Sequence, residues 1–316
     1  MKEKSQLLNI PIPFYDESLK GLIIRACMLN KIKFPLMYKF ANLRSQNEPI
    51  NVNDINETRL EKLGEILNIK ADLLSSLTFH NAFKKCDIKI KNSIVYMGMF
   101  NGQTKICPKC LDECGYHRKL WDCKIYCVCP FHRCMLVENC QKCYRSIYTH
   151  RSNILKCECG FMYSEASVKT CEHEEVIEFS MMLHNKLFDQ SRFIISKLYC
   201  LDHNLEFAQA IYLVMHFVKR ISQILYKRNI NFSYNSDFNN LHQIILKVIC
   251  VFIDLPNSLH VLLDEIYQQP FKKKYPLHTS DLHFTVIRNL LMPEFKFILD
   301  PYQQYIDKVA SKFDSM

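Results

Sequence analysis

Sixteen cysteines are distributed unevenly along this 316-residue chain, and eleven of them lie between Cys107 and Cys159. The first ten residues, MKEKSQLLNI, lack the apolar core of a secretory signal, and no apolar run reaches the roughly 20 residues of a membrane-spanning helix. We therefore expect a cytoplasmic protein with no membrane attachment. In a reducing compartment, clustered cysteines bind metal more often than they form disulfides. The cluster thus predicts a local metal-binding module.

The first predicted set of metal ligands consists of two pairs, each separated by two residues. Cys107-Pro-Lys-Cys110 and Cys129-Pro-Phe-His132 both place proline directly after the first ligand, and 18 residues separate the two pairs. A tight turn of this kind lets two side chains hold one ion, and two such turns complete the four-coordinate site that zinc prefers. We predict that Cys107, Cys110, Cys129 and His132 bind one zinc ion (site 1).

A second set follows directly along the chain. Cys140-Gln-Lys-Cys143 precedes Cys157-Glu-Cys159-Gly160, with 13 residues between the two pairs. The last pair is separated by one residue only, which is less regular, but Gly160 permits the tight backbone turn that this spacing needs. We predict that Cys140, Cys143, Cys157 and Cys159 bind a second zinc ion (site 2).

Rival ligands remain for both sites. Cys127 lies two residues before Cys129 and competes for the first ion, whereas Cys171 and His173 compete for the second. The other unassigned cysteines of the segment are interpreted as small buried apolar residues: Cys114, Cys123 and Cys134.

Both predicted sites have four protein ligands and no open position. Structural zinc sites are closed in this way, whereas catalytic zinc keeps a position for water or substrate. The sequence also lacks a glycine-rich phosphate-binding loop, a Gly-x-Ser-x-Gly motif and a His-Glu-x-x-His motif. We therefore expect two structural zinc ions and no enzymatic activity.

Helical patterns flank the cysteine segment on both sides. Before it, Asp16-Glu17-Ser18 precedes apolar residues at helical spacing, and an amphipathic stretch over 60–67 leads through a turn at Asn68-Ile69 to a short helix over 70–77. This arrangement is compatible with a DNA-binding helix-turn-helix, although plain helix packing gives the same pattern. After the segment, breaks at several prolines, including Pro301, divide the predicted helices: 174–200, 204–228, 238–253, 256–268, 279–292 and 301–313.

We therefore predict a mainly α protein with three domains. An N-terminal helical domain, helix-turn-helix-like, occupies residues 1–105, a tandem zinc-binding module with little regular structure occupies 106–170, and an all-α domain occupies 171–316. Residues 1–170 carry 26 Lys and Arg against 16 Asp and Glu, while the remainder carries 15 against 16. The positive excess favours a polyanionic partner for the first half of the chain.

The loop between the two ligand pairs of site 1 contains aromatic and basic residues. Tyr116 and Trp121, the only tryptophan, are interpreted as a small core beneath the zinc. Arg118, Lys119 and Lys124 leave two interpretations open, a basic surface for phosphates or charges with no special role.

Several of these motifs follow one another in a specific order: Pro11-Ile-Pro13, Asp16-Glu17-Ser18-Leu19, Cys107-Pro-x-Cys110-Leu111, Gly115-Tyr116, Trp121, Cys129-Pro-x-His132 with Leu136, and Cys140-x-x-Cys143. This order resembles the TniQ family of bacterial transposon target-selection proteins, whose longer relatives are the TnsD proteins. The resemblance covers about residues 10–165. The spacing Cys157-x-Cys159 departs from the regular pattern.

The resemblance implies a non-enzymatic adaptor that links recognition of target DNA to an AAA+ transposition regulator, which recruits the transposase. Some such proteins read DNA directly, and others join an RNA-guided CRISPR surveillance complex (Cascade) with its guide RNA and target DNA, often as homodimers. The short chain and the modest net charge of +9 favour the Cascade-associated class. The alternative is a zinc-containing sequence-specific DNA-binding protein, either a TnsD-like direct reader or a transcription regulator.

Overall fold

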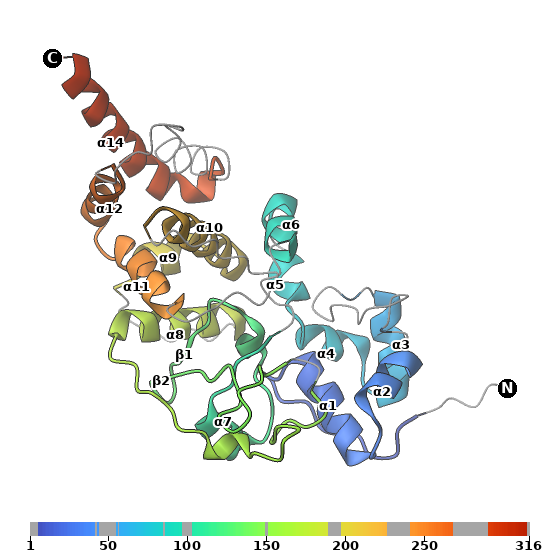
Figure 1. Cartoon of the computed structure of the whole chain (residues 1–316). Coiled ribbons are helices and arrows are strands. Elements are labelled where there is room, and N and C mark those ends of the chain that lie inside the picture. Colours follow the sequence, from blue (N-terminus) through green and yellow to red (C-terminus); the bar gives the residue numbers. More distant parts are fainter. Residues whose placement is uncertain are drawn as a thin grey trace, which may run out of the picture. The chain divides into compact units, whose positions relative to one another are not determined.

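The structure, a computed structural model, contains two compact units, one within Met1–Glu172 and the other from His173 onward (Figure 1). The division falls close to the predicted start of the C-terminal domain. The predicted boundary between residues 105 and 106 lies inside the first unit and stays a prediction. The structure describes residues 6–41, 43, 55, 57–84, 86–96, 103–148, 151–188, 197–225, 241–267 and 290–314.

The first helix begins at the residue that the sequence predicts. The Oγ atom of Ser18 accepts a hydrogen bond from the N–H of Gly21 at 2.9 Å, so α1 (Leu19–Leu29) starts with one of its free N–H groups satisfied. Nearly all of α1 is buried, apart from its last turn. α2 (Phe34–Phe40), which has proline in its first turn, packs against it.

α3 (Glu57–Leu67) and α4 (Ala71–Ser76) form a helix-turn-helix pair. Asn68 opens the turn in the left-handed conformation with φ of 49°. A Cβ atom built on Gly64 would stand 2.6 Å from the backbone oxygen of Ile69, so only glycine lets the turn approach α3 this closely. Five leucines are buried along the pair: Leu60, Leu63, Leu67, Leu74 and Leu77.

Two further short helices, α5 (His80–Lys84) and α6 (Ile88–Tyr96), lead towards the central region, which has little regular structure. Its strands β1 (Val128–Cys129) and β2 (Cys134–Met135) pair antiparallel, with Cys129 opposite Cys134. Its remaining elements are helical turns: α7 (Pro108–Cys114), η2 (Lys119–Asp122) and η3 (Tyr163–Glu165).

The second unit is helical in its described residues. α10 (Phe207–Leu225) is buried along most of its length, and α8 (Glu174–Phe188) and α11 (Leu241–Val251) pack against it and against each other. The other elements follow in chain order: α9 (Tyr199–Asn204), α12 (Asn257–Tyr267), η4 (Pro293–Phe295) and α14 (Lys296–Asp314).

The predicted break at Pro301 is wrong, because α14 begins at Lys296 and continues through this proline. Proline removes one backbone hydrogen bond from a helix, but burial of Tyr302 and Tyr305, in a helix that packs against α12, offsets that loss. The carbonyl oxygen of Pro301 also accepts a hydrogen bond from Nε2 of His260 at 3.0 Å.

The other predicted helices of this unit have mixed outcomes. Those over 204–228, 238–253 and 256–268 are found as α10, α11 and α12. Residues 226–228, 238–240 and 268 of these predictions lie outside the described part. The helix predicted over 174–200 is found as α8, and residues 189–196 lie outside the described part. Most of the helix predicted over 279–292 also lies outside it.

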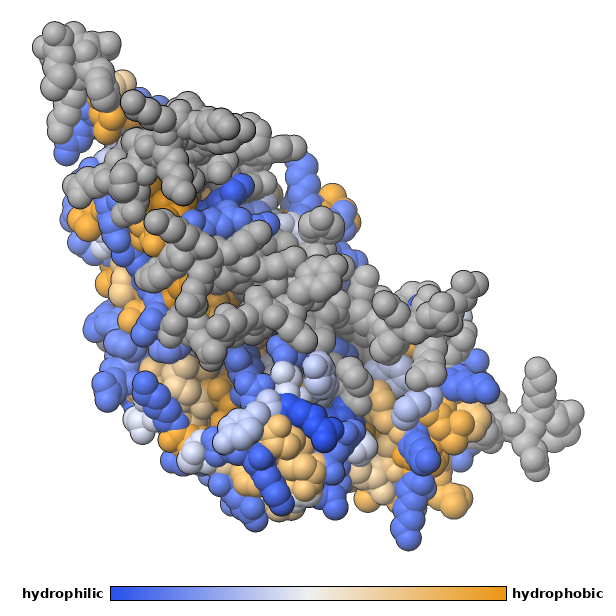
Figure 2. All heavy atoms as spheres, viewed as in Figure 1, coloured by the Kyte–Doolittle hydropathy of each residue, from blue (hydrophilic) through white to orange (hydrophobic). Residues whose placement is uncertain are grey.

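The prediction of a mainly α protein with an irregular central region is confirmed. Hydrophilic and apolar areas alternate over the described part of the face shown in Figure 2. Among the described helices, none combines the length and the apolar character that crossing a membrane requires.

Candidate metal centres and the loop that supports them

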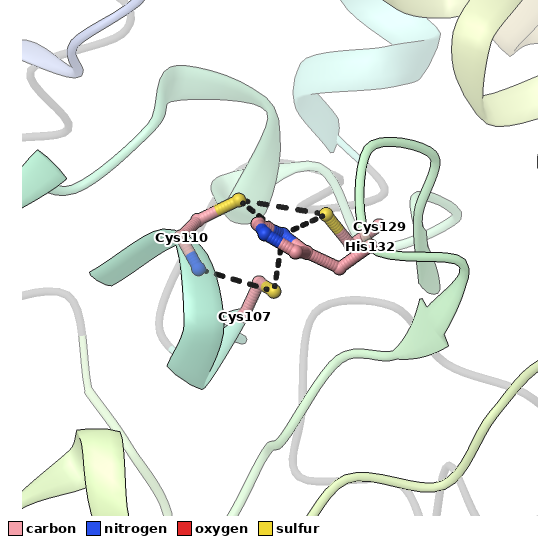
Figure 3. A group of neighbouring side chains, drawn as sticks. All are labelled: Cys107, Cys110, Cys129 and His132. Atoms are coloured by element: carbon pink, nitrogen blue, oxygen red, sulfur yellow. Dashed lines mark hydrogen bonds between the residues drawn. The ribbon is translucent and has the colours of Figure 1, made fainter. Parts of the chain in front are cut away.

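The first half of site 1 is built on the start of α7. Cys107 is the N-cap residue, Pro108 occupies the first turn, and Cys110 follows one turn later (Figure 3). The Sγ atom of Cys107 accepts a hydrogen bond from the N–H of Cys110 at 3.5 Å. A helix N-terminus is a favourable place for thiolates because its free N–H groups and dipole stabilise negative charge.

The hairpin of β1 and β2 supplies the second half of site 1. Cys129 ends β1, and the turn brings His132 over the α7 cysteines. The Nδ1 atom of His132 lies 3.5 Å from the sulfur of Cys107, 3.2 Å from that of Cys110 and 3.6 Å from that of Cys129 (Figure 3). One nitrogen therefore faces all three sulfur atoms.

The other nitrogen of His132 has a partner of its own. Nε2 lies 2.8 Å from Oε1 of Glu113, which comes from α7. A carboxylate that accepts a hydrogen bond from Nε2–H leaves Nδ1 unprotonated, as a metal ligand must be. The pair thus orients the imidazole for binding at Nδ1.

Site 2 is built from two turns in the loop region after β2. The sulfur atoms of Cys140 and Cys159 lie 3.6 Å apart, and those of Cys143 and Cys157 lie 3.7 Å apart. In the second turn the N–H of Gly160 donates to the carbonyl oxygen of Cys157, with φ of 86° at the glycine. The irregular Cys157-x-Cys159 spacing is therefore accommodated by the left-handed conformation that Gly160 permits.

Both groups fit the demands of a zinc ion. In each, one donor atom from every residue lies within 4.8 Å of all the others. Two sulfur ligands at about 2.3 Å from a tetrahedral ion are separated by roughly 3.8 Å, close to the separations found here. The eight residues can therefore hold two metal ions, one in each group, and the donors are those that zinc prefers.

The thiols of site 1 differ electrostatically from an ordinary buried cysteine. Hydrogen bonds from the thiols of Cys110, Cys129 and Cys134 hold the pKa of Cys107 well below its usual value. At Cys123, burial raises the pKa to about 12. The same thiol contacts raise the pKa of Cys110, so within site 1 the thiol of Cys110 donates and the thiolate of Cys107 accepts, whereas Cys123 keeps its proton because it is buried.

The predicted rivals lie outside the two groups. The thiol of Cys127 donates to the carbonyl oxygen of Lys124 at 3.6 Å, and neither Cys171 nor His173 joins site 2. Cys134 differs from the other unassigned cysteines, because its sulfur lies 3.7 Å from that of Cys107. Sequence spacing gave no sign of this contact, which depends on the pairing of β1 with β2.

Two sequence motifs about 100 residues apart meet next to site 1. The carboxylate of Asp16 accepts hydrogen bonds from the hydroxyl of Tyr116, at 2.5 Å, and from the guanidinium of Arg118. Backbone bonds reinforce the contact: the N–H of Ser18 donates to the carbonyl of His117, and that of Lys119 donates to the carbonyl of Asp16. We call this contact the Asp16 junction, and it joins the start of α1 to the loop of site 1.

A buried polar network lies beneath the Asp16 junction. Arg151 donates to Nδ1 of His117 at 3.0 Å, so Nε2 of the imidazole carries the proton and donates to Asp122 at 2.9 Å. The hydroxyl of Thr104 also donates to Asp122, at 2.8 Å. Burial lowers the pKa of His117 and keeps the imidazole neutral. Burial alone would raise the pKa of Asp122. Its interactions with His117, Lys20 and Thr104 lower the pKa by more than burial raises it, so the net pKa falls and the carboxylate stays charged.

The structure separates the two interpretations of the loop residues. Tyr116 and Trp121 are buried, in agreement with a small core. Lys119 and Lys124 are only 4% and 6% exposed, so a phosphate-binding surface built from them is wrong. The ammonium of Lys119 instead donates to the carbonyl oxygen of Ser76 at 2.8 Å, at the end of α4. Arg118 is paired with Asp16.

Comparison with known proteins relates part of the chain to a protein family. No curated protein matches the chain at a significant level. A model of the TniQ family matches residues 9–136, which include both partners of the Asp16 junction and all four residues of site 1. Site 2 lies beyond the matched region. The match covers less than half of the chain, and it identifies residues 9–136 as a TniQ family domain, which implies a role in transposition.

Proposed function

We propose that this protein is a non-enzymatic target-selection adaptor for DNA transposition. It links a complex that recognises target DNA to an AAA+ transposition regulator. The observation that carries the proposal is the TniQ domain over residues 9–136. In this domain the Asp16 junction joins the start of α1 to the loop of site 1. An adaptor needs rigid surfaces rather than reactive groups, and both candidate sites have four protein donors each.

The two groups of four residues each bind one structural zinc ion in this proposal. Zinc would link segments that have few regular elements of their own, and its binding would contribute folding free energy to the central region. Native mass spectrometry of the purified chain tests this directly. We expect two zinc ions per chain, and a metal-free folded chain would refute it.

The target-recognition complex is, in our proposal, an RNA-guided Cascade complex. The alternative, direct DNA reading through α3 and α4, is favoured by the helix-turn-helix geometry around Gly64. However, α4 is a short helix without Lys or Arg, and its exposed residues include Asp72 and Leu73. Base-reading helices are usually held on DNA by cations that contact phosphates. The exposed face of α4 therefore suits a protein partner better than a DNA groove.

Reconstituted integration tests the adaptor function. The chain should support insertion of a donor element only together with a guide complex, an AAA+ regulator and a transposase encoded beside it. Co-purification of the chain with the guide complex should persist after nuclease treatment. Tight binding of the isolated chain to one duplex sequence at physiological salt would refute the association with Cascade and support direct reading of DNA by this protein. Absence of transposition genes in the neighbourhood would refute the adaptor function.

The oligomeric state also belongs to the proposal. We infer a homodimer from the resemblance to Cascade-associated adaptors. Light scattering of the eluting protein during size-exclusion chromatography should give twice the chain mass of 37.5 kDa. A mass that stays monomeric at micromolar concentrations would refute the dimer and leave the adaptor function open to its own tests.

A further inference from the structure

A groove of about 300 Å³ lies between α11 and α12 in the second unit, outside the TniQ match. α11 and the turn after it line the groove from Lys247 to Asp254, and α12 lines it from Asn257 to Glu265. On both, the lining residues are spaced as on a single helix face. α12 rises about 12 Å over this stretch, slightly more than two helical turns. The groove is therefore long enough to hold two turns of a third helix.

The centre of the groove is apolar and open to solvent. Val251 and Leu262 are each 3% exposed and form its base, whereas the lining residue Val261 is 67% exposed. The contact between α12 and α14 uses other residues, His260 and Asp264, so α14 leaves this face of α12 accessible. Small-molecule sites usually enclose most of the ligand. An open apolar stripe between paired helices suits a protein partner better.

The charges at one end of the groove compensate each other. The ammonium of Lys247 donates to both carboxylate oxygens of Glu265, at 2.8 and 2.6 Å. Among the described residues that line the groove, Lys247 is the only cation. The lining charge that remains is therefore negative.

That negative charge lies towards the other end of the groove. Asp254 is exposed there, and its two carboxylate oxygens each lie 3.4 Å from the neutral amide nitrogen of the Asn257 side chain. Burial raises the pKa of the Cys250 thiol and the charge of Glu175 raises it further, which places a second carboxylate, from the start of α8, near the groove. Such a surface repels a nucleic-acid backbone and attracts a cationic side chain.

We propose that the groove binds an amphipathic helix of a partner protein, whose apolar side chains cover Val261 and whose lysine or arginine pairs with Asp254. A docking helix of this kind presents apolar residues at intervals of three, four and seven, which two turns suffice to display. The inference rests on the proposed adaptor function, because the helix belongs to one of the two assemblies that the adaptor links, the guide complex or the AAA+ regulator.

Binding of the full-length chain to two purified probes, the guide complex and the AAA+ regulator encoded beside it, tests the groove. Val261→Glu places a carboxylate where apolar side chains dock, so the Kd for one probe should rise at least about tenfold while the Kd for the other stays unchanged. Asp254→Lys should weaken the same complex more strongly than Asp254→Asn does, because it sets like charges against each other.

Two matched controls come from the same unit. Leu291 is 67% exposed, as Val261 is, but it does not line the groove. Leu291→Glu should therefore bind both probes as the unsubstituted chain does, and neither glutamate should disturb folding. Asp307 is an exposed carboxylate of α14 outside the groove, so Asp307→Lys controls for the change of charge.

The result that overturns the inference is binding of both probes by Val261→Glu as tightly as by Leu291→Glu. A loss with Val261→Glu but none with Asp254→Lys would overturn the basic character of the helix. If Val261→Glu changes only the mass of the chain in solution, from dimer to monomer, a second copy occupies the groove instead. If the unsubstituted chain binds neither probe, the adaptor function itself fails, which distinguishes that failure from a failure of the groove alone.

Discussion

Replacement of Asp16 by alanine tests whether the Asp16 junction stabilises the first unit. The Asp16 side chain is 1% exposed and binds two partners, the hydroxyl of Tyr116 and the guanidinium of Arg118. Arg118 is itself only 15% exposed in its side chain. The substitution removes one carboxylate and leaves a largely buried cation without its ion-pair partner.

The expected cost follows from these burial values. Removal of one partner from a buried ion pair costs about 3–5 kcal/mol, and residual solvent access to Arg118 places this pair at the lower end. The lost hydrogen bond from Tyr116 to a charged acceptor adds about 1 kcal/mol. We expect the free energy of unfolding to fall by about 4 kcal/mol, or roughly 10 °C in Tm for a unit of this size.

Trp121 provides the assay, because the only tryptophan of the chain lies buried in the first unit. Urea unfolding followed by its fluorescence reports this unit alone. The control is Asp112→Ala, since Asp112 is exposed on α7, and surface substitutions usually change stability by less than about 0.5 kcal/mol. If Asp16→Ala costs no more than Asp112→Ala, the junction does not stabilise the unit. Additivity with Arg118→Met would show that the ion pair contributes nothing of its own.

Three further changes have defined outcomes. Gly64→Ala places a Cβ atom 2.6 Å from the backbone oxygen of Ile69, so overpacking outweighs the gain in helix propensity. The free energy of unfolding measured in urea should fall by about 1 kcal/mol. A rise in this free energy would contradict the close packing of the turn against α3. Burial raises the pKa of Glu17 to about 7, above its value in the unfolded chain, so the stability that its protonated form contributes at low pH is lost as the pH rises towards 7. Glu17→Gln should therefore lessen the decline in unfolding free energy between pH 5 and 8. An unchanged decline would contradict the raised pKa of Glu17. Cys143→Ser should lower the zinc content measured by native mass spectrometry from two ions to one, whereas Cys123→Ser should keep both.

Local features could be predicted from the sequence because their causes lie within a few residues. The start of α1 follows from the cap at Ser18, and the two ligand groups follow from spacings inside single turns. Helix ends in the second unit were less predictable. Pro301 indicates a break locally, yet the packing of α14 against α12 keeps it helical.

Features that depend on distant contacts could not be predicted. The residues around Asp16 indicate only the start of a helix, and nothing near it in the sequence indicates a partner 100 residues away. Lysines such as Lys119 and Lys124 usually lie on the surface, but the fold buries both and directs the ammonium of Lys119 to the end of α4. The contact between Cys134 and Cys107 likewise requires the hairpin to form first.

The position of Arg151 sets a lower limit on how short a functional version of this protein can be. The TniQ family match ends at residue 136, but the guanidinium of Arg151 reaches back to His117 inside the matched region. A chain cut at residue 136 would lose that partner and expose a core imidazole to water. Shortened or exchanged versions of the domain should therefore keep the chain through Glu172, where the first unit ends.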